Sequence, residues 1–168
     1  METHMRLARA LPDDAEAMLM VHRAAIRGTA AAFYEPAIIE AWAPLPLRPD
    51  HIDALAQRIE SGEEEAIVAR DQSGAIIGFG SFIPSARELR AVYVAPDHGR
   101  RGIGGAILGT LELRARKYGL SELVMDATLN AEIFYRRHGF TVERSGEHIL
   151  RGGLRMACIR MRKRLTPQ

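Results

Sequence analysis

The sequence predicts a mixed α+β fold in which a mostly antiparallel sheet is flanked by helices. Apolar residues in the first 62 positions recur mainly at helical spacing, whereas the next region changes to short apolar runs separated by turns. One long amphipathic pattern then interrupts the later strands. The expected order is β-ααα-βββ-α-β-α-ββ. Neither a repeat nor a linker divides residues 1–168, so we expect a single domain.

The N-terminal region is expected to form one strand and three helices. Alternating polar and apolar residues predict the strand, and Pro12-Asp13-Asp14 opens the first helix, because acids are favoured at a positive helix N-terminus. Prolines between 44 and 49 exclude a helix there, and Asp50 can cap the next one. The expected elements are a strand at 6–10 and helices at 12–30, from Pro36, and at 50–61.

The rest of the chain is expected to form six strands and two helices. The turn Gln72-Ser73-Gly74 between two apolar runs predicts a hairpin, and Gly152-Gly153 predicts another. An apolar stripe at helical spacing predicts a helix that Gly119 terminates. The expected strands are 66–70, 75–83, 88–94, 122–127, 140–150 and 154–161, and the expected helices are 102–118 and 130–138.

The composition is typical of an ordinary globular protein, with 47% hydrophobic and 26% charged residues. The sequence contains no apolar run of about 18 residues, the length that could span a membrane. The first residues, Met1 to Arg6, lack the order of a secretory signal, so we expect a cytoplasmic location. The net charge of +2 is small, and acids such as Glu63-Glu64-Glu65 offset the arginines, so nucleic acid is not an expected partner.

The single cysteine, Cys158, lies in an apolar run and has no partner for an intramolecular disulfide. Because no other ligands surround it in the sequence, it is a poor metal site. We therefore expect a buried structural thiol and no metal ion.

A glycine-rich segment between a strand and a helix is the most informative part of the sequence. After Pro96, the run Gly99-Arg100-Arg101-Gly102-Ile103-Gly104-Gly105-Ala106 leads into an amphipathic helix. Free amides and the partial positive charge of a helix N-terminus suit a phosphate or pyrophosphate. A Walker loop is excluded because the chain has no Gly-Lys pair, and a dinucleotide fingerprint would need glycine at Ile107. Helix packing alone is the alternative explanation for the glycines.

Two segments, Glu88 to Gly105 and Asn130 to Phe140, resemble landmarks of the GNAT superfamily of acyl-CoA-dependent N-acyltransferases. The family loop has Gln or Arg, two residues, Gly, one residue, then Gly or Ala, after a strand that ends like Tyr93-Val94-Ala95-Pro96. This chain departs from the pattern at Gly99, where the family has Gln or Arg. We expect backbone amides to bind the pyrophosphate, with help from Arg100 or Arg101.

The resemblance implies a GNAT-like fold and direct transfer of an acetyl group from acetyl-CoA to an amine in a ternary complex. It implies an acyl-CoA-binding core at about 64–162 and acceptor-side helices at about 12–62. The amide of Val92 would bind the acetyl oxygen and that of Val94 the pantetheine. The implied acyl-CoA-binding residues are Val92, Tyr93, Val94, Gly99, Arg100, Arg101, Gly102, Ile103, Gly104, Gly105, Ala106, Asn130, Phe134 and Tyr135.

Two catalytic residues follow from the same resemblance. Tyr135 matches the general acid that protonates the departing thiolate, although it is also explained as a core aromatic residue beside Phe134. Glu88 stands 14 residues before Gly102, where the histone-modifying branch has its catalytic base. Strand alternation, however, places Arg90 on the face of Glu88, so a structural ion pair is the alternative.

Several assignments stay open at this stage. Asn130 matches a pantetheine ligand and would also serve as a helix N-cap. His148, His138 and His98 are weaker site candidates. The region from His22 to Pro49, with aromatic residues Phe33, Tyr34 and Trp42, is expected to shape the acceptor site. For Trp42, a place in the hydrophobic core is the alternative. Alternatives are a non-catalytic acetyl-CoA-binding regulatory module and an enzyme acting on a ribosomal protein or charged tRNA; a homodimer is a habit of the family.

Overall fold

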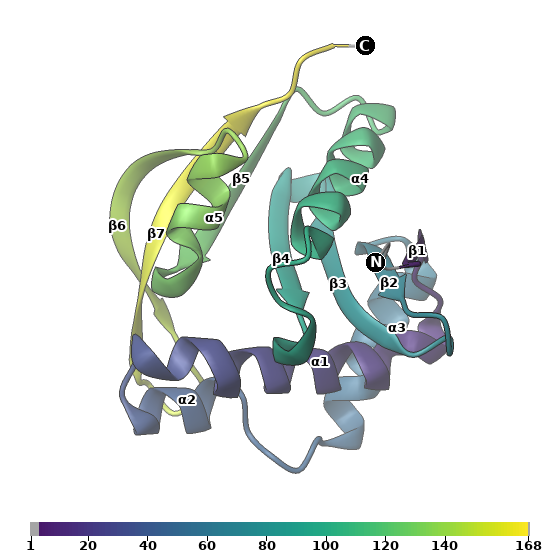
Figure 1. The fold of residues 1–168 in the computed structure, drawn as a ribbon. Coiled ribbons are helices and arrows are strands. Elements are labelled where there is room, and N and C mark those ends of the chain that lie inside the picture. Colours follow the sequence, from purple (N-terminus) through teal and green to yellow (C-terminus); the bar gives the residue numbers. More distant parts are fainter. Residues whose placement is uncertain (1–3, 168) are drawn as a thin grey trace.

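A seven-stranded sheet with the order β1-β2-β3-β4-β5-β7-β6 forms the centre of the computed structural model, which describes residues 4–167 (Figure 1). The strands are β1 (Arg6–Arg9), β2 (Glu65–Arg70), β3 (Ile76–Ile83), β4 (Glu88–Val94), β5 (Glu122–Thr128), β6 (Thr141–Ile149) and β7 (Arg155–Arg164). The helices are α1 (Ala15–Thr29), α2 (Pro36–Trp42), α3 (Pro49–Ser61), α4 (Ile103–Lys117) and α5 (Glu132–Arg137).

This architecture confirms the predicted α+β class and the predicted order of elements. All strand pairs are antiparallel except β4 with β5. Residues 1–3, part of the stretch examined for a secretory signal, and residue 168 lie outside the described residues. Within residues 4–167, no helix has both the length and the apolar character needed to cross a bilayer.

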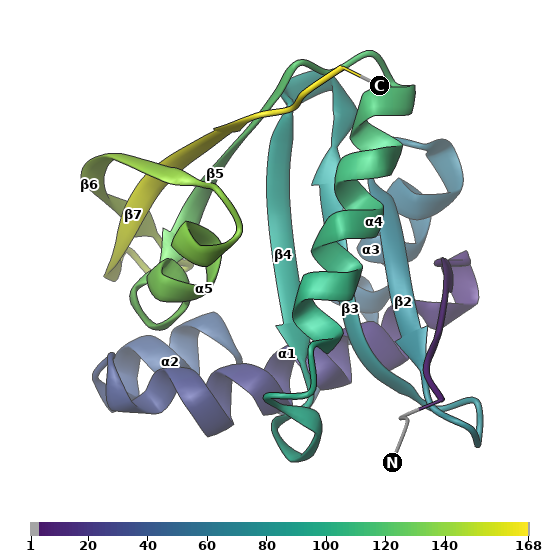
Figure 2. The same ribbon diagram turned by 45° about the horizontal axis from the view of Figure 1, so that its top comes forward.

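Helices cover the two faces of the sheet unequally (Figure 2). Helix α4 packs on β2, β3 and β4, and its Ile107 and Leu111 join a large core with Phe82 and Leu123. Helices α1 and α3 cover the opposite face, where Met18 packs with other apolar side chains in a second core. Helix α5 packs against β5 and β6.

Strands β4 and β5 pair only where they begin. Glu88 opposite Val124 is the single register pair found between them in the described chain, and the Val124 amide donates to the Arg87 carbonyl at 2.9 Å. Beyond this point the two strands diverge (Figure 2). A bulge lies at the same end of β4, because Ser81 opposes Ala91 and Phe82 opposes Leu89, which leaves Arg90 without a partner on β3. Such a bulge bends the strand and increases its local twist.

Two predicted capping roles are wrong. Asp50 does not cap α3, because Pro49 occupies the first helical position and Arg48 is the N-cap; Asp50 pairs with Arg48 instead. Asn130 does not cap α5, because a 3₁₀ turn at Leu129–Ala131 comes first and Ala131 is the N-cap. The buried position predicted for Cys158 is confirmed.

Candidate active site

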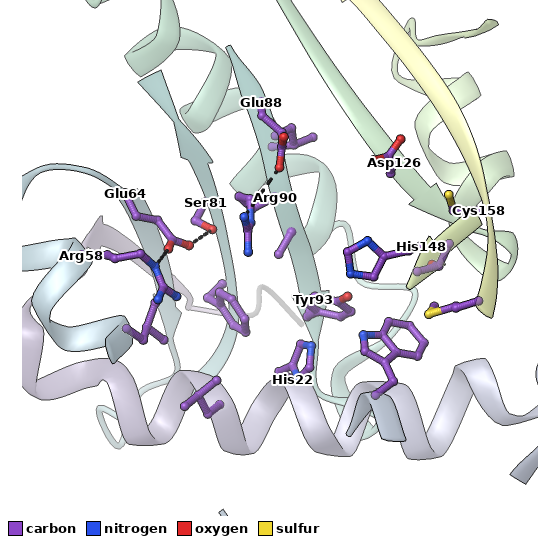
Figure 3. A pocket seen from close by; sticks show the side chains of 18 residues that line it. His22, Arg58, Glu64, Ser81, Glu88, Arg90, Tyr93, Asp126, His148 and Cys158 are labelled. Carbon is purple, nitrogen blue, oxygen red and sulfur yellow. Dashed lines mark hydrogen bonds and ion pairs between the residues drawn. The ribbon is translucent and has the colours of Figure 1, made fainter. Parts of the chain in front are cut away.

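The divergence of β4 and β5 separates the sheet into two parts, β1-β2-β3-β4 and β5-β7-β6. A cavity of about 280 Å³ lies between these two parts and helices α1 and α3 (Figure 3). Aromatic and apolar side chains form part of its wall. The charged and hydrogen-bonding side chains that line it come from helices α1 and α3, strands β3, β4, β5 and β6, and the turn before β2. They are His22, Arg58, Glu64, Ser81, Glu88, Arg90, Asp126, Thr128 and His148.

A second cavity of about 110 Å³ occupies the gap between β4 and β5. Its lining includes Val92 and Val94 from β4, together with Asn130 and Tyr135 from the region that follows β5. The two cavities share five lining residues, which are Arg90, Ala91, Tyr93, Asp126 and Thr128. A molecule in one cavity would therefore come close to a molecule in the other at these residues.

The backbone amides of Val92 and Val94 point into the gap. The Ala95 amide donates to the Ile77 carbonyl on β3 at 2.8 Å. Successive residues of a strand direct their amides to opposite edges, so Tyr93 faces β3 like Ala95, whereas Val92 and Val94 face away from it. Because β5 has already diverged, these two amides face the second cavity instead of a neighbouring strand.

The Tyr135 side chain meets the Val92 amide at this cavity. Tyr135 is only 3% exposed. Burial, and secondarily the neighbouring Tyr93, raise the pKa of Tyr135 far above its ordinary value, while the nearby Val92 amide acts in the opposite direction. The phenol therefore keeps its proton at neutral pH, and it lies beside an amide that can polarise a carbonyl group.

Two buried polar side-chain atoms lack hydrogen-bond partners within residues 4–167, and one of them lies at the second cavity. They are Oδ1 of Asn130, which lines the cavity, and Nδ1 of His98, in the loop before α4. A buried polar atom without a partner is costly, so an orphan at a cavity wall indicates a ligand that would satisfy it. Oδ1 of Asn130 is thus available to accept a hydrogen bond from a polar ligand in the gap.

The glycine-rich loop presents unbonded amides. The hydrogen bonds of the described residues use none of the amides of residues 100–105. Arg100 and Gly102 adopt left-handed conformations, with φ of 61° and 76°, which gathers successive N–H groups on a concave surface. Arg100 and Arg101 are exposed and form no ion pair in the described part of the chain. The loop can therefore bind an anion without a side chain at Gly99.

Helix packing explains two of the loop glycines. A Cβ on Gly105 would lie 2.9 Å from Nε2 of His138, and one on Gly104 would lie 3.3 Å from the Phe134 ring. His138 is itself fixed, because its Nδ1 lies 2.8 Å from the Phe134 carbonyl. Packing therefore accounts for the missing side chains at Gly104 and Gly105, while the backbone amides of both residues stay unbonded.

The predicted base, Glu88, lines the larger cavity but not the second cavity. It lies at the closed end of the gap, where β4 and β5 still pair, and its Oε1 is 3.7 Å from Nη1 of Arg90. The expected ion pair is therefore present but long.

A second carboxylate, Asp126, was not predicted and lies where the cavities adjoin. Its Oδ1 is 3.3 Å from Nη1 of Arg160. A sequence signal existed, since Asp126 is the one charged residue in the run Leu123-Val124-Met125-Asp126-Ala127. Its side chain is 47% exposed, on the side of β5 that faces the cavities.

His22 was also missed, and it lies at the floor of the larger cavity (Figure 3). Its Nδ1 is 2.8 Å from Nη1 of Arg23. A guanidinium can only donate, so Nδ1 accepts and the imidazole is neutral with its proton on Nε2. The ring packs edge-on against Tyr93 and Trp42, with centroids 4.8 and 6.2 Å away. Burial, and then the charge of Arg23, lower the pKa of His22 from 6.5 to about 3.

The three aromatic residues expected at the acceptor site have different positions. Trp42 lines the larger cavity and also packs against a small core with Ile39. Phe33 is exposed and away from the cavity. The Tyr34 hydroxyl accepts from the Leu129 amide at 2.8 Å and donates to the Ala157 carbonyl at 2.7 Å. Tyr34 therefore ties the region before α2 to β7 and to the turn that contains Asn130.

Comparison with known proteins decides the family. The family model described as an acetyltransferase (GNAT) domain matches residues 31–165. The chain belongs to the GNAT acetyltransferase family. The predicted GNAT resemblance and the predicted class of enzyme, an acyltransferase, are confirmed.

Related proteins agree with this family. The uncharacterized N-acetyltransferase YafP of Escherichia coli K12 is 29% identical over 129 residues, which are 77% of this chain and 76% of that protein. A GCN5-related N-acetyltransferase from Rhodopseudomonas palustris is 27% identical, with a TM-score of 0.84 over 98% of this chain and 99% of that one. PaiA N-acetyltransferase from Thermoplasma acidophilum, solved with coenzyme A, has the same fold, with a TM-score of 0.77, 22% identity and coverage of 95% and 98%.

The low pKa of His22 predicts an acid-dependent loss of stability. Between pH 6.5 and about 3 the unfolded chain binds a proton at His22 that the folded chain excludes. The contribution of His22 to the free energy of unfolding should therefore be complete above pH 6.5. As the pH is lowered from 6.5, the free energy of unfolding should decrease, by at most about 1.4 kcal/mol per pH unit from this group. Urea unfolding at several pH values should show this dependence weakened in His22→Asn and unchanged in His4→Asn, which alters an exposed histidine. Equal pH dependence in all three proteins would contradict the buried, neutral imidazole.

Proposed function

We propose that the protein is an N-acetyltransferase that transfers the acetyl group of acetyl-CoA to the amine of a small molecule or peptide within a ternary complex. The observation that carries this proposal is the pair of adjoining cavities. One is lined by free strand amides and is continuous in the chain with an anion-binding loop, and the other is lined by acidic, basic and aromatic side chains. The coenzyme A complex of the Thermoplasma PaiA protein supports the identity of the donor.

In this proposal, the gap between β4 and β5 binds the pantetheine arm. The Val94 amide donates to it, Oδ1 of Asn130 accepts from it, the Val92 amide donates to the acetyl oxygen, and the amides of residues 100–105 bind the pyrophosphate. Arg100 or Arg101 adds a positive charge in place of the side chain absent at Gly99. The loop and strand thereby hold the thioester beside Tyr135 and Asp126.

The chemistry requires one bond to form and one to break. Acetyl-CoA supplies a thioester whose carbonyl carbon bonds to the amine nitrogen while the C–S bond breaks; the amine loses a proton and the thiolate gains one. The Val92 amide polarises the carbonyl group, a type of contact worth about 3 kcal/mol of transition-state stabilisation. Tyr135 holds the proton that the thiolate receives, and a carboxylate of the larger cavity takes the proton from the ammonium group.

Removal of the Tyr135 hydroxyl tests the acid. Tyr135→Phe should lower kcat about 100-fold, because the proton donor is lost, and should leave the Kd for acetyl-CoA nearly unchanged, because the ring stays packed. CoA release with an amine panel measures kcat, and calorimetry measures Kd. Tyr118→Phe is the matched control, since that hydroxyl bonds Glu65 and lines neither cavity.

The outcomes of that comparison separate the alternatives. Unchanged turnover in Tyr135→Phe would remove the proposed acid. Tight acetyl-CoA binding by the native protein without acetylation of any amine would favour a regulatory module instead.

A pair of matched amide substitutions tests the base. Asp126 lines both cavities whereas Glu88 lines one, so we expect Asp126→Asn to lower kcat/KM about 100-fold at pH 7 and Glu88→Gln to lower it less than tenfold. The Asp126→Asn loss should diminish as the pH rises toward the pKa of the amine, because free amine then no longer needs a base. The opposite order of effects, with the same recovery at high pH, would assign the base to Glu88, as the family resemblance implies.

A further inference from the structure

The larger cavity has an arginine at the end farthest from β5 and β7. In Figure 3, Arg58 groups with Glu64 and Ser81 on one side, whereas Asp126 and His148 lie on the other, with Glu88 and Arg90 between them. Arg58 comes from α3, so it belongs to the acceptor-side part of the chain. The proposed function gives no role to this end of the cavity.

A buried carboxylate holds Arg58 in place. Glu64 is 5% exposed, and its Oε2 accepts from Nε of Arg58 at 2.9 Å. Its Oε1 accepts from the hydroxyl of Ser81 at 2.6 Å, and Ser81 is 1% exposed. The Glu64 amide also donates to the Arg58 carbonyl at 3.1 Å. Both carboxylate oxygens are therefore engaged inside the protein, and Glu64 fixes the arginine from behind.

Fold stability is a weak explanation for this network. Burial of a carboxylate costs desolvation energy that an ion pair recovers only with good geometry, and apolar side chains of similar volume are often at least as stabilising. The surrounding wall already contains such side chains, namely Leu19, Leu55 and Phe79. A network that instead fixes one guanidinium orientation makes sense if that guanidinium binds something.

The bonds to Glu64 leave the outer part of Arg58 free. Only Nε is used, so Nη1 and Nη2 have no protein acceptor among residues 4–167, and about a third of the side chain, 34%, stays exposed at the cavity. Arg90, whose contact with Glu88 is long, adds a second guanidinium to the same wall. Planar guanidinium groups bind carboxylates through two parallel hydrogen bonds.

We propose that Arg58 forms an anion-binding subsite, so that the acceptor is a small amino acid in the broad sense, with a carboxylate at one end, an apolar middle and the reacting amine at the other. This inference rests on the proposed function for the position of the amine, near Asp126. The cavity volume of about 280 Å³ suits a small molecule. Arg58 binds the carboxylate, and the apolar wall formed by Leu19, Leu55 and Phe79 contacts the middle of the acceptor.

Matched acceptor pairs test the subsite. ω-Amino acids of increasing chain length and α-amino acids with apolar side chains are each compared with the corresponding carboxamide, by calorimetric binding to the CoA-loaded protein and by CoA release from acetyl-CoA. At the preferred length, the acid should bind about 10- to 100-fold more tightly than its amide, as expected for hydrogen bonds to a charged group. Arg58→Gln should abolish this preference by raising Kd and KM for the acid alone, without change in the KM for acetyl-CoA.

Two further variants make the test specific. Arg48→Gln is the matched control, because Arg48 pairs with Asp50 on the exposed surface and lines neither cavity. Ser81→Ala removes one support of Glu64 and should reduce the preference for the acid partly, although Ser81 is too deeply buried to be the anion ligand. If Arg58→Gln fails to fold, as judged from its melting curve, Ser81→Ala and the selectivity of the native protein still decide the question.

The outcomes distinguish the subsite from the proposed function. Equal binding of acids and amides by the native protein, or an equal loss for both in Arg58→Gln, overturns the subsite while acetylation of amines stands. Arg58-dependent binding of acids without acetylation of any amine overturns the proposed function and leaves the subsite in place.

Discussion

The early divergence of β4 from β5 is the constraint on which the rest of the structure depends. Continuous pairing would occupy the Val92 and Val94 amides and close the second cavity. The strands separate after the Glu88–Val124 pair, where the bulge at Arg90 bends β4. Both parts of the sheet remain supported, because the core under α4 includes residues of β5 and α5. The separation therefore creates a binding gap inside a sheet without dividing its core.

The gap also fixes the relation between the two halves of the site. Asn130 and Tyr135 follow β5 and reach the gap from one side, while the glycine-rich loop follows β4 and begins at its open end. The Tyr34 hydroxyl ties the region before α2 to the turn that contains Asn130. The segment between α1 and α2 is thus held to the elements around the gap by two specific hydrogen bonds. The charged groups of the larger cavity then give it a direction, with Asp126 at the gap and Arg58 at the far end.

Local signals made much of this structure predictable. Periodicity and turn glycines predicted every strand and helix with small errors at the ends, the glycine-rich run indicated the loop, and the resemblance to the GNAT family led to Asn130 and Tyr135. Asp126 left one local signal, its charge within an apolar run, whereas no motif singled out His22 or Arg58; the three belong to β5, α1 and α3 and line one cavity only through the topology of the fold. The Tyr34 hydroxyl makes two hydrogen bonds, to residues 129 and 157, and no local pattern indicates them. The bulge at Arg90 was likewise hidden, since alternation alone assumes a regular strand.

The most direct test of the central claim is an amide-resolved NMR titration of the protein with acetyl-CoA. If the gap between β4 and β5 binds the donor, the amide resonances of Val92, Val94 and residues 100–105 should change most, and they should do so together at one saturating concentration. Binding with changes confined to other parts of the chain, or no binding by the folded protein, would contradict the account.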